Sequence, residues 1–345
     1  MSEPVPWGAG VATGIGSMPG EDIVEALRVV LGELPDLPYL PELPARGPGA
    51  DLVGRTAGAL VDLHVDLQPS GWRLVDRPGR DVRRARDLAE RDLDALQEVA
   101  GDHRGPLKVQ IGGPWTLAAS VELPRGDRAL SDRGACRDLT ESLAEGVRLL
   151  VGEVRRRVPG AHPVLQLDEP SLPAVLAGRI PTASGYGTLR VIDEPEARAA
   201  LALVTSAGGV PVVLHCCALD VPVGLAVGAG MRAVSFDAGL VGARLDDQLG
   251  AAVDAGLALF CGLVPATAPA TAPANTPATA SPAGADRLAA PARALWRRLG
   301  FAPESLPERI VVTPTCGQAG ASPDYARRAL RLARETAGVL AESPE

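Results

Sequence analysis

A histidine and a cysteine two residues apart close an apolar run of the sequence. The run Val-Val-Leu-His-Cys-Cys covers residues 212–217 and contains His215 and Cys217. Side chains of a strand alternate between its two faces, so His215 and Cys217 share a face while Cys216 points away. An imidazole nitrogen beside a thiolate sulfur is a donor pair that zinc prefers. The plain alternative is that both are buried core residues.

Two further candidate ligands occupy equivalent places in the sequence. Asp237 ends the apolar run 233–237, and Cys316 directly follows the run 310–315. Each lies just past a predicted strand, as His215 does. If these strands are parallel neighbours, their carboxyl ends meet at one edge of the sheet. We therefore predict a site for Zn²⁺ formed by His215, Cys217, Asp237 and Cys316.

Short apolar runs alternate along the chain with longer amphipathic segments. The predicted strands cover residues 11–17, 38–43, 107–112, 164–168, 212–215, 233–237, 257–264 and 310–315. The predicted helices cover residues 21–34, 81–99, 132–158, 194–207, 245–255, 285–299 and 323–340. About eight strand-then-helix units predict an α/β fold, a TIM (β/α)8 barrel that forms a single domain over residues 1–345. An open doubly wound sheet is the alternative, and three prolines make the second strand the least regular.

Polar residues follow most of these runs, at the end of a barrel where chemistry takes place. Gly-Ser-Met-Pro (16–19) follows the first run, and Glu42 lies at the end of the second. Gly-Gly-Pro-Trp-Thr (112–116) follows the third, and Asp-Glu-Pro-Ser (168–171) follows the fourth. We expect these residues to surround the predicted zinc site.

Composition excludes several classes of function. The net charge is −8 and aromatic residues make up 3%, so we expect no nucleic-acid partner. No uncharged apolar run reaches the roughly 20 residues of a membrane span, and the first residues do not resemble a signal peptide. Five cysteines in a chain of 345 residues suit a reducing compartment better than a disulfide framework. We expect free thiols and a cytoplasmic protein that does not bind a membrane.

One segment departs from the pattern of strands and helices. Residues 265–282 are almost entirely Ala, Thr and Pro, a composition that cannot pack a core. The segment follows the seventh predicted strand, so we expect a low-complexity loop near the site end of the barrel. It is either a tolerated surface insertion or a lid.

Taken together, the strand-end motifs resemble the catalytic barrel of cobalamin-independent methionine synthase. They are Ile-Gly-Ser-Met-Pro (15–19), Gly-Pro-Trp-Thr (113–116), Gln-Leu-Asp-Glu-Pro (166–170), His-Cys-Cys (215–217), Ser-Phe-Asp (235–237) and Cys-Gly (316–317). The resemblance spans nearly the whole chain and is closest to the single-barrel members. It implies a methyltransferase of methionine biosynthesis that converts homocysteine to methionine at zinc. Asp237 stands where the family has Glu, one methylene longer.

The resemblance also assigns the substrate and donor residues. Ser17, the backbone of Ile15, Asp168 and Glu42 match the positions that hold the amino-acid part of homocysteine. Asp168 would pair with the substrate ammonium and would take no part in binding the metal.

Two positions on the donor side depart from the family. The aromatic of folate-using members aligns with Ser120, and their histidine motif after the seventh strand is replaced by Val-Pro-Ala-Thr (264–267). Trp115 is a possible stacking face. The methyl donor is therefore either methyltetrahydrofolate or a corrinoid carrier, and we expect the free folate to be the poorer donor. The competing functions are a metal-free enzyme like uroporphyrinogen decarboxylase and a non-catalytic barrel that binds zinc or a thiol.

Overall fold

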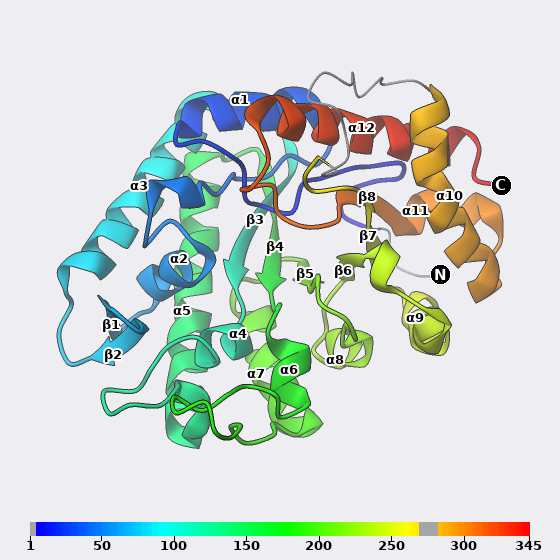
Figure 1. Ribbon diagram of the computed structural model, residues 1–345. Helices are drawn as coiled ribbons and strands as arrows, with labels where there is room; N and C mark the ends of the chain where they lie inside the picture. Colours follow the sequence, from blue (N-terminus) through cyan, green and yellow to red (C-terminus); the bar gives the residue numbers. More distant parts are fainter. Residues whose placement is uncertain (1–4, 269–281) are drawn as a thin grey trace.

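The computed structural model describes residues 5–268 and 282–345 (Figure 1). Most of the predicted Ala/Thr/Pro loop, 265–282, lies outside the described residues. Within the part that is described, no helix is both long and apolar enough to cross a membrane.

Six parallel strands form a curled sheet with helices on its outside (Figure 1). Their order in the sheet follows the sequence, β3-β4-β5-β6-β7-β8. All six coincide with predicted strands, and helices separate them in the sequence as expected for parallel neighbours. The arrangement is consistent with a TIM-like barrel. The strands are β3 (Gly105–Gly112), β4 (Ala161–Asp168), β5 (Val212–His215), β6 (Ala233–Asp237), β7 (Ala258–Val264) and β8 (Ile310–Pro314).

The first two predicted strands do not form regular strands. Their segments make only isolated bridges, which pair Ala12 with Val312 of β8, Ser17 with Glu42, and Tyr39 with Lys108 of β3. The prolines at 38 and 41 have no N–H for a ladder, which is one reason why pairing stays local in the second segment. Among the described residues, six of the eight predicted strands are regular and the first two form bridged segments.

Several helices begin where a short polar side chain accepts backbone N–H groups. Asp22 caps α1, Asp132 caps α5 and Asp193 caps α7, and Ser322 caps α12. The long helices are α1 (Ile23–Glu33), α3 (Arg80–Ala100), α5 (Arg133–Arg157), α7 (Glu194–Ala207), α9 (Asp246–Asp254), α10 (Pro282–Leu299) and α12 (Pro323–Glu342). Shorter helices are α2 (Leu52–Ala59), α4 (Pro114–Ala118), α6 (Leu172–Leu176), α8 (Val223–Gly228) and α11 (Leu306–Arg309).

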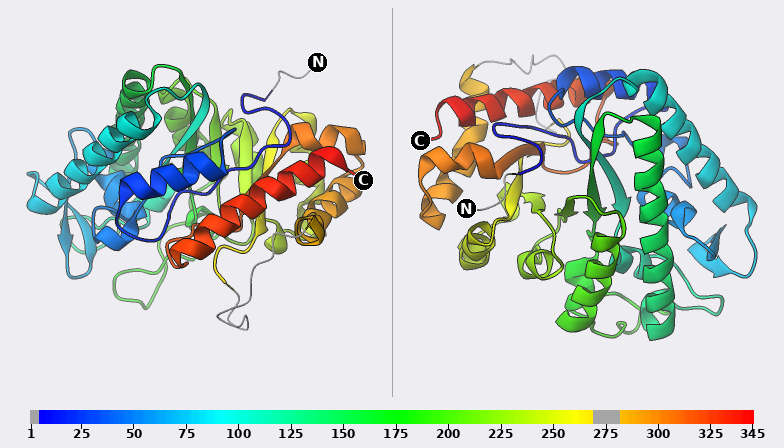
Figure 2. Two further views of the ribbon diagram at one scale, coloured as in Figure 1. Left: turned by 90° about the horizontal axis from the view of Figure 1, so that it is seen from above. Right: turned by 180° about the vertical axis from the view of Figure 1, so that it is seen from behind.

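The first and last helices lie side by side across the top of the molecule (Figures 1 and 2). Glu33 of α1 accepts hydrogen bonds from Arg327 at 2.9 Å and from Arg331 at 2.8 Å, both on α12. The carboxylate is 5% exposed, and these hydrogen bonds lower its pKa to about 2. This ion cluster ties the two ends of the chain together.

A small hairpin was not expected from the sequence. Strands β1 (His64–Gln68) and β2 (Gly71–Val75) pair antiparallel around a two-residue turn, Pro69–Ser70. Gly71 has φ +135°, a conformation that favours glycine. Trp72 anchors the hairpin, because its side chain is 5% exposed and packs in the core.

The inner face of the sheet changes character along the strands. Near their amino ends, apolar side chains pack with Trp7, whose ring meets Phe260 edge-on at 4.9 Å. Alternate residues further along the strands are polar and buried: Lys108 and Gln110 on β3, Gln166 and Asp168 on β4, His215 on β5, Ser235 on β6 and Thr313 on β8. The interior is therefore an apolar plug below a polar layer that opens at the carboxyl ends.

Candidate metal centre

Three of the four predicted zinc ligands come together at the carboxyl ends of β5 and β8. The ligand atoms of His215, Cys217 and Cys316 all lie within 4.8 Å of one another. The two sulfurs are 3.3 Å apart. His215 is 4% exposed, while both cysteines are partly exposed. Two thiol sulfurs and an imidazole nitrogen, close together and reachable from outside, are a donor set that fits zinc.

The histidine ring is oriented by the neighbouring strand. Nδ1 of His215 lies 3.0 Å from the hydroxyl of Ser235 on β6, and the two residues are paired in the sheet register. With Nδ1 engaged, Nε2 is the nitrogen left for a ligand role. Such a partner on the other ring nitrogen is a regular feature of histidines that bind metals.

The two thiols share their protonation. The hydrogen bond from Cys217, followed by one from His215, lowers the pKa of Cys316 to about 4. The same contact raises the pKa of Cys217, because loss of its proton would place two negative charges side by side. The contact thus favours the thiolate form of Cys316, and a thiolate is the form that binds a metal.

Asp237, the fourth predicted ligand, is not part of this cluster within the described chain. Its carboxylate Oδ1 accepts the N–H of Gly239 at 2.8 Å and caps a short turn that begins directly after β6. Three of the four predicted ligands are therefore clustered, and a ligand role for Asp237 stays a prediction.

Asp168 lies next to the cluster on the neighbouring strand. It pairs with His215 in the register of β4 and β5, and its Oδ1 accepts a hydrogen bond from the Gln166 amide at 2.7 Å. Burial raises the pKa of Asp168 to about 7, while the charges of His215 and Lys108 act in the opposite direction. A carboxylate in such surroundings favours a cationic partner.

Ser17 and Glu42 lie opposite each other in an isolated parallel bridge at the same end of the sheet. Met18 N donates to Glu42 O at 2.8 Å, and Glu42 N donates to Gly16 O at 3.1 Å. The Glu42 side chain is buried and lies 3.4 Å from Arg55 Nε. Its charge influences the pKa of both Asp168 and Lys108, so the carboxylates of Glu42 and Asp168 share one electrostatic environment.

Lys108 and Gln166 take part in this polar layer and were missed in the sequence. The ammonium of Lys108 and the amide of Gln166 both donate to the carbonyl of Ile15, at 2.9 and 2.8 Å. Burial lowers the pKa of Lys108 to about 7, and the carboxylates of Asp168 and Glu42 oppose that shift. A usable signal existed, because Lys108 is the only lysine of the chain and interrupts an apolar strand.

Gln318 is a second residue that the sequence did not single out. It is 2% exposed, two residues after Cys316, and its backbone N donates to Ser17 O at 2.8 Å. Its side-chain amide has no hydrogen-bond partner among the described residues. Gly317 lies between Cys316 and Gln318, and a Cβ there would lie 2.2 Å from Ser17 Oγ, so the serine hydroxyl would have to rotate.

The predicted donor-side residues lie in the helix layer. Trp115 is 2% exposed and its indole N–H donates to Ala197 O of α7 at 3.1 Å. Ser120 Oγ donates to Thr116 O at 2.7 Å within its own turn. Trp115 packs against α7, and its role as a stacking face stays a prediction. Thr116 and Glu169 also have a structural contact: the buried Glu169 carboxylate accepts hydrogen bonds from the Thr116 hydroxyl and N–H at 2.6 and 2.7 Å.

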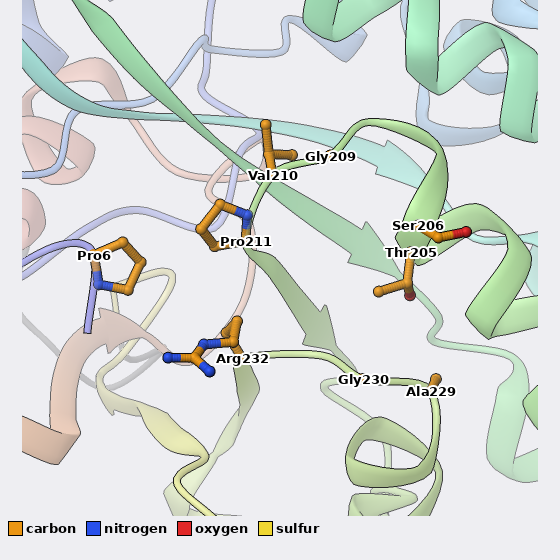
Figure 3. A pocket seen from close by; sticks show the side chains of 9 residues that line it. All are labelled: Pro6, Thr205, Ser206, Gly209, Val210, Pro211, Ala229, Gly230 and Arg232. Carbon is orange, nitrogen blue, oxygen red and sulfur yellow. The ribbon is translucent and has the colours of Figure 1, made fainter. Parts of the chain in front are cut away.

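A separate cavity of about 710 Å³ lies at the opposite end of the sheet (Figure 3). Val210 and Pro211 precede β5 and Arg232 precedes β6, so this cavity is at the amino ends of the strands. Figure 3 shows the Arg232 side chain extending toward Pro6 and away from Thr205. In barrels of this kind that end serves stability, so the cavity is not the candidate site.

Comparisons with known proteins agree with this geometry. A model of the family described as cobalamin-independent synthase, catalytic domain, matches residues 11–339. A solved B12-independent methionine synthase from Shewanella sp. W3-18-1, in complex with selenomethionine, is 12% identical over 97% of this chain and 98% of that chain, with a TM-score of 0.59. A morphinone reductase variant in complex with tetrahydroNAD is also 12% identical, over 90% and 85%, but its TM-score of 0.41 is too low to support a shared fold. No curated protein matches the sequence.

At 12% identity the methionine synthase structure supports the fold alone. The family match covers nearly the whole chain and supports more. The chain therefore belongs to the cobalamin-independent synthase family, as its catalytic domain, and is an enzyme of the methyltransferase class.

Proposed function

We propose that this protein is a zinc-dependent methyltransferase that converts homocysteine to methionine. The observation that carries the proposal is the group of His215, Cys217 and Cys316, whose ligand atoms lie within 4.8 Å at the open end of the sheet. These three residues would hold the ion. When bound, zinc supplies the Lewis acidity that removes the proton of a substrate thiol, whose free pKa is roughly 8.5, near neutral pH.

The chain's own residues prepare the site for a thiol. The two sulfur ligands bring negative charge, which keeps a neighbouring substrate sulfur electron-rich, and Ser235 fixes the histidine ring at 3.0 Å. Three protein ligands leave a coordination position free for the substrate, as in other catalytic zinc sites. Asp237 is a neighbour of the site in this proposal and not a required ligand, because its Oδ1 is engaged by Gly239 N.

The amino-acid end of the substrate would lie against Asp168, Glu42 and Ser17. Asp168 adjoins His215 in the sheet, so a molecule with sulfur at the cluster reaches this carboxylate with its ammonium. Ser17 follows at the same edge and can donate its hydroxyl to a carboxylate. A short thiol with an amino-acid end is the substrate class that matches this order of groups.

The methyl donor would reach the site from the open face. The indole of Trp115 is buried against α7, so it offers no stacking surface for a pterin. We therefore favour a corrinoid carrier over free methyltetrahydrofolate as the donor.

A parallel assay tests the function. Purified protein would be analysed for metal and incubated with homocysteine and either methyltetrahydrofolate, methylcobalamin or S-methylmethionine. We expect about one zinc per chain and methionine formation with at least one donor. Absence of zinc would favour the metal-free enzyme related to uroporphyrinogen decarboxylase. Bound zinc without methyl transfer from any donor would favour the non-catalytic, thiol-binding barrel.

A further inference from the structure

The only lysine of the chain is fully buried in the polar layer beneath the candidate site. Lys108 is 0% exposed, whereas the other residues among the 34 Lys and Arg are all arginine. Burial of an ammonium group is strongly unfavourable unless the group is paired and hydrogen-bonded. A lysine at this position therefore calls for a specific role.

The contacts of Lys108 exclude a direct contact with substrate. Its Nζ donates to Ile15 O at 2.9 Å, to Gln166 Oε1 at 2.8 Å and to Gln110 Oε1 at 3.3 Å. An ammonium has three N–H groups, so all of its donors are used. Lys108 can act on a substrate only through the groups that it holds.

Gln166 links Lys108 to Asp168. Because Lys108 can only donate, the amide must turn its oxygen toward the ammonium. Its nitrogen then donates to Asp168 Oδ1 at 2.7 Å and to Ile15 O at 2.8 Å. Without the ammonium, the Gln166 oxygen loses the donor that holds it at 2.8 Å, and the amide is fixed only through its nitrogen.

The Ile15 carbonyl is also changed by this arrangement. It accepts from both Lys108 and Gln166, and a carbonyl oxygen has two lone pairs. No lone pair is then left for a substrate ammonium. That ammonium must be met by carboxylates, and Asp168 and Glu42 are the two whose charges act on Lys108.

We infer that Lys108 is a positioning residue for the amino-acid end of the substrate: through Gln166 it fixes Asp168, and its charge keeps the two carboxylates together in the buried pocket. The inference rests on the proposed function and adds to it the origin of selectivity for an α-amino thiol.

The test compares homocysteine with 4-mercaptobutyrate, which is the same thiol acid without the amino group. Dissociation constants and zinc content would be measured for wild type and Lys108→Met. We expect the variant to keep its zinc and its affinity for 4-mercaptobutyrate, and to lose roughly 10- to 100-fold in affinity for homocysteine. In an Asp168→Asn background, Lys108→Met should cost less affinity than it does in wild type, because the part of its effect that passes through Asp168 is already lost.

Thr313→Val is the matched control. Thr313 is also 0% exposed on the inner face, and its hydroxyl has no partner among the residues described. The variant should keep the preference for homocysteine, because Thr313 makes no contact with Lys108, Gln166 or Asp168 that the inference uses.

A measurement on wild type keeps the inference testable if Lys108→Met does not fold. Protein labelled with ¹³C-lysine gives one lysine side-chain signal, because the chain has a single lysine. Homocysteine should shift this signal, and 4-mercaptobutyrate should not. If Lys108→Met prefers homocysteine as strongly as wild type does, or if both thiols shift the signal equally, the inference about Lys108 is overturned while the proposed function stands. Wild type that binds neither thiol would overturn the proposed function as well.

Discussion

Replacing Asp168 by asparagine removes a charge from the proposed substrate pocket without changing its volume. Asp168 is 7% exposed, and one of its oxygens is already bound by the Gln166 amide at 2.7 Å. In the Asp168→Asn variant the single oxygen of the new amide must take over that contact, so its NH₂ group faces the position of the substrate ammonium. The amide NH₂ and the substrate ammonium, which are both donors, would then face each other where the carboxylate had accepted a hydrogen bond.

The size of the effect follows from the type of bond that is lost. A hydrogen bond to a charged group contributes about 1.5–3 kcal/mol, which corresponds to roughly a 10- to 150-fold loss of homocysteine affinity. Isothermal titration would measure that affinity, and metal analysis would show unchanged zinc, because Asp168 lies outside the ligand cluster. Binding of 4-mercaptobutyrate serves as the control. Unchanged homocysteine affinity would refute the role of Asp168, and loss of zinc would show that it supports the metal site instead.

Three further predictions concern the metal, the ends of the chain and the donor. Cys217→Ser and Cys316→Ser should each lose most of the bound zinc while Cys216→Ser, buried and facing away, should keep it; full zinc in both ligand variants would remove the site. Glu33→Gln should lower the free energy of unfolding at pH 7 by on the order of 1–2 kcal/mol, a figure reduced because the arginine partners are exposed. The pKa of Glu33 is lowered from 4.5 to about 2, so its contribution is present above pH 4.5 and is lost as the pH falls toward 2; urea unfolding at pH 7 and pH 3 should show wild type and variant converging in acid. Methyltetrahydrofolate should support turnover well below that with methylcobalamin, because the histidine motif of folate-using members is replaced at 264–267 and general acid catalysis alone is worth about 10²- to 10⁴-fold. Comparable rates with the two donors would contradict the donor assignment.

The alternation of side chains along a strand was enough to predict the clustering of three candidate metal ligands. His215 and Cys217 were paired from their spacing, and Cys316 from its place after a later strand. All three predictions depend only on side-chain direction and on parallel strands ending at one edge, which the sheet preserves. Asp237 met the same conditions but its short side chain bonds to Gly239 N, a local contact that strand periodicity does not reveal.

Residues outside the strand ends were harder to place from the sequence. Trp115 follows β3 in a motif that suggested the open face, yet the first turn of α4 directs its indole outward to Ala197. Lys108 lies inside an apolar run that predicts a core strand, so its place in the polar layer was not predicted. Along these strands polar side chains point inward and the apolar side chains between them point outward. A polar residue at every second position of a strand was therefore the signal for the polar layer.

The metal ligands and the substrate pocket are mechanically connected at one point of the chain. Gly317 follows Cys316 directly and touches Ser17 so closely that a Cβ would lie 2.2 Å from its hydroxyl oxygen. The next residue, Gln318, donates its backbone N–H to Ser17 O at 2.8 Å. A displacement of the Cys316 sulfur would therefore move the proposed carboxylate contact of the substrate with it. The hydrogen bond between Gln318 and Ser17 therefore links the predicted metal ligands and the proposed amino-acid pocket through the backbone.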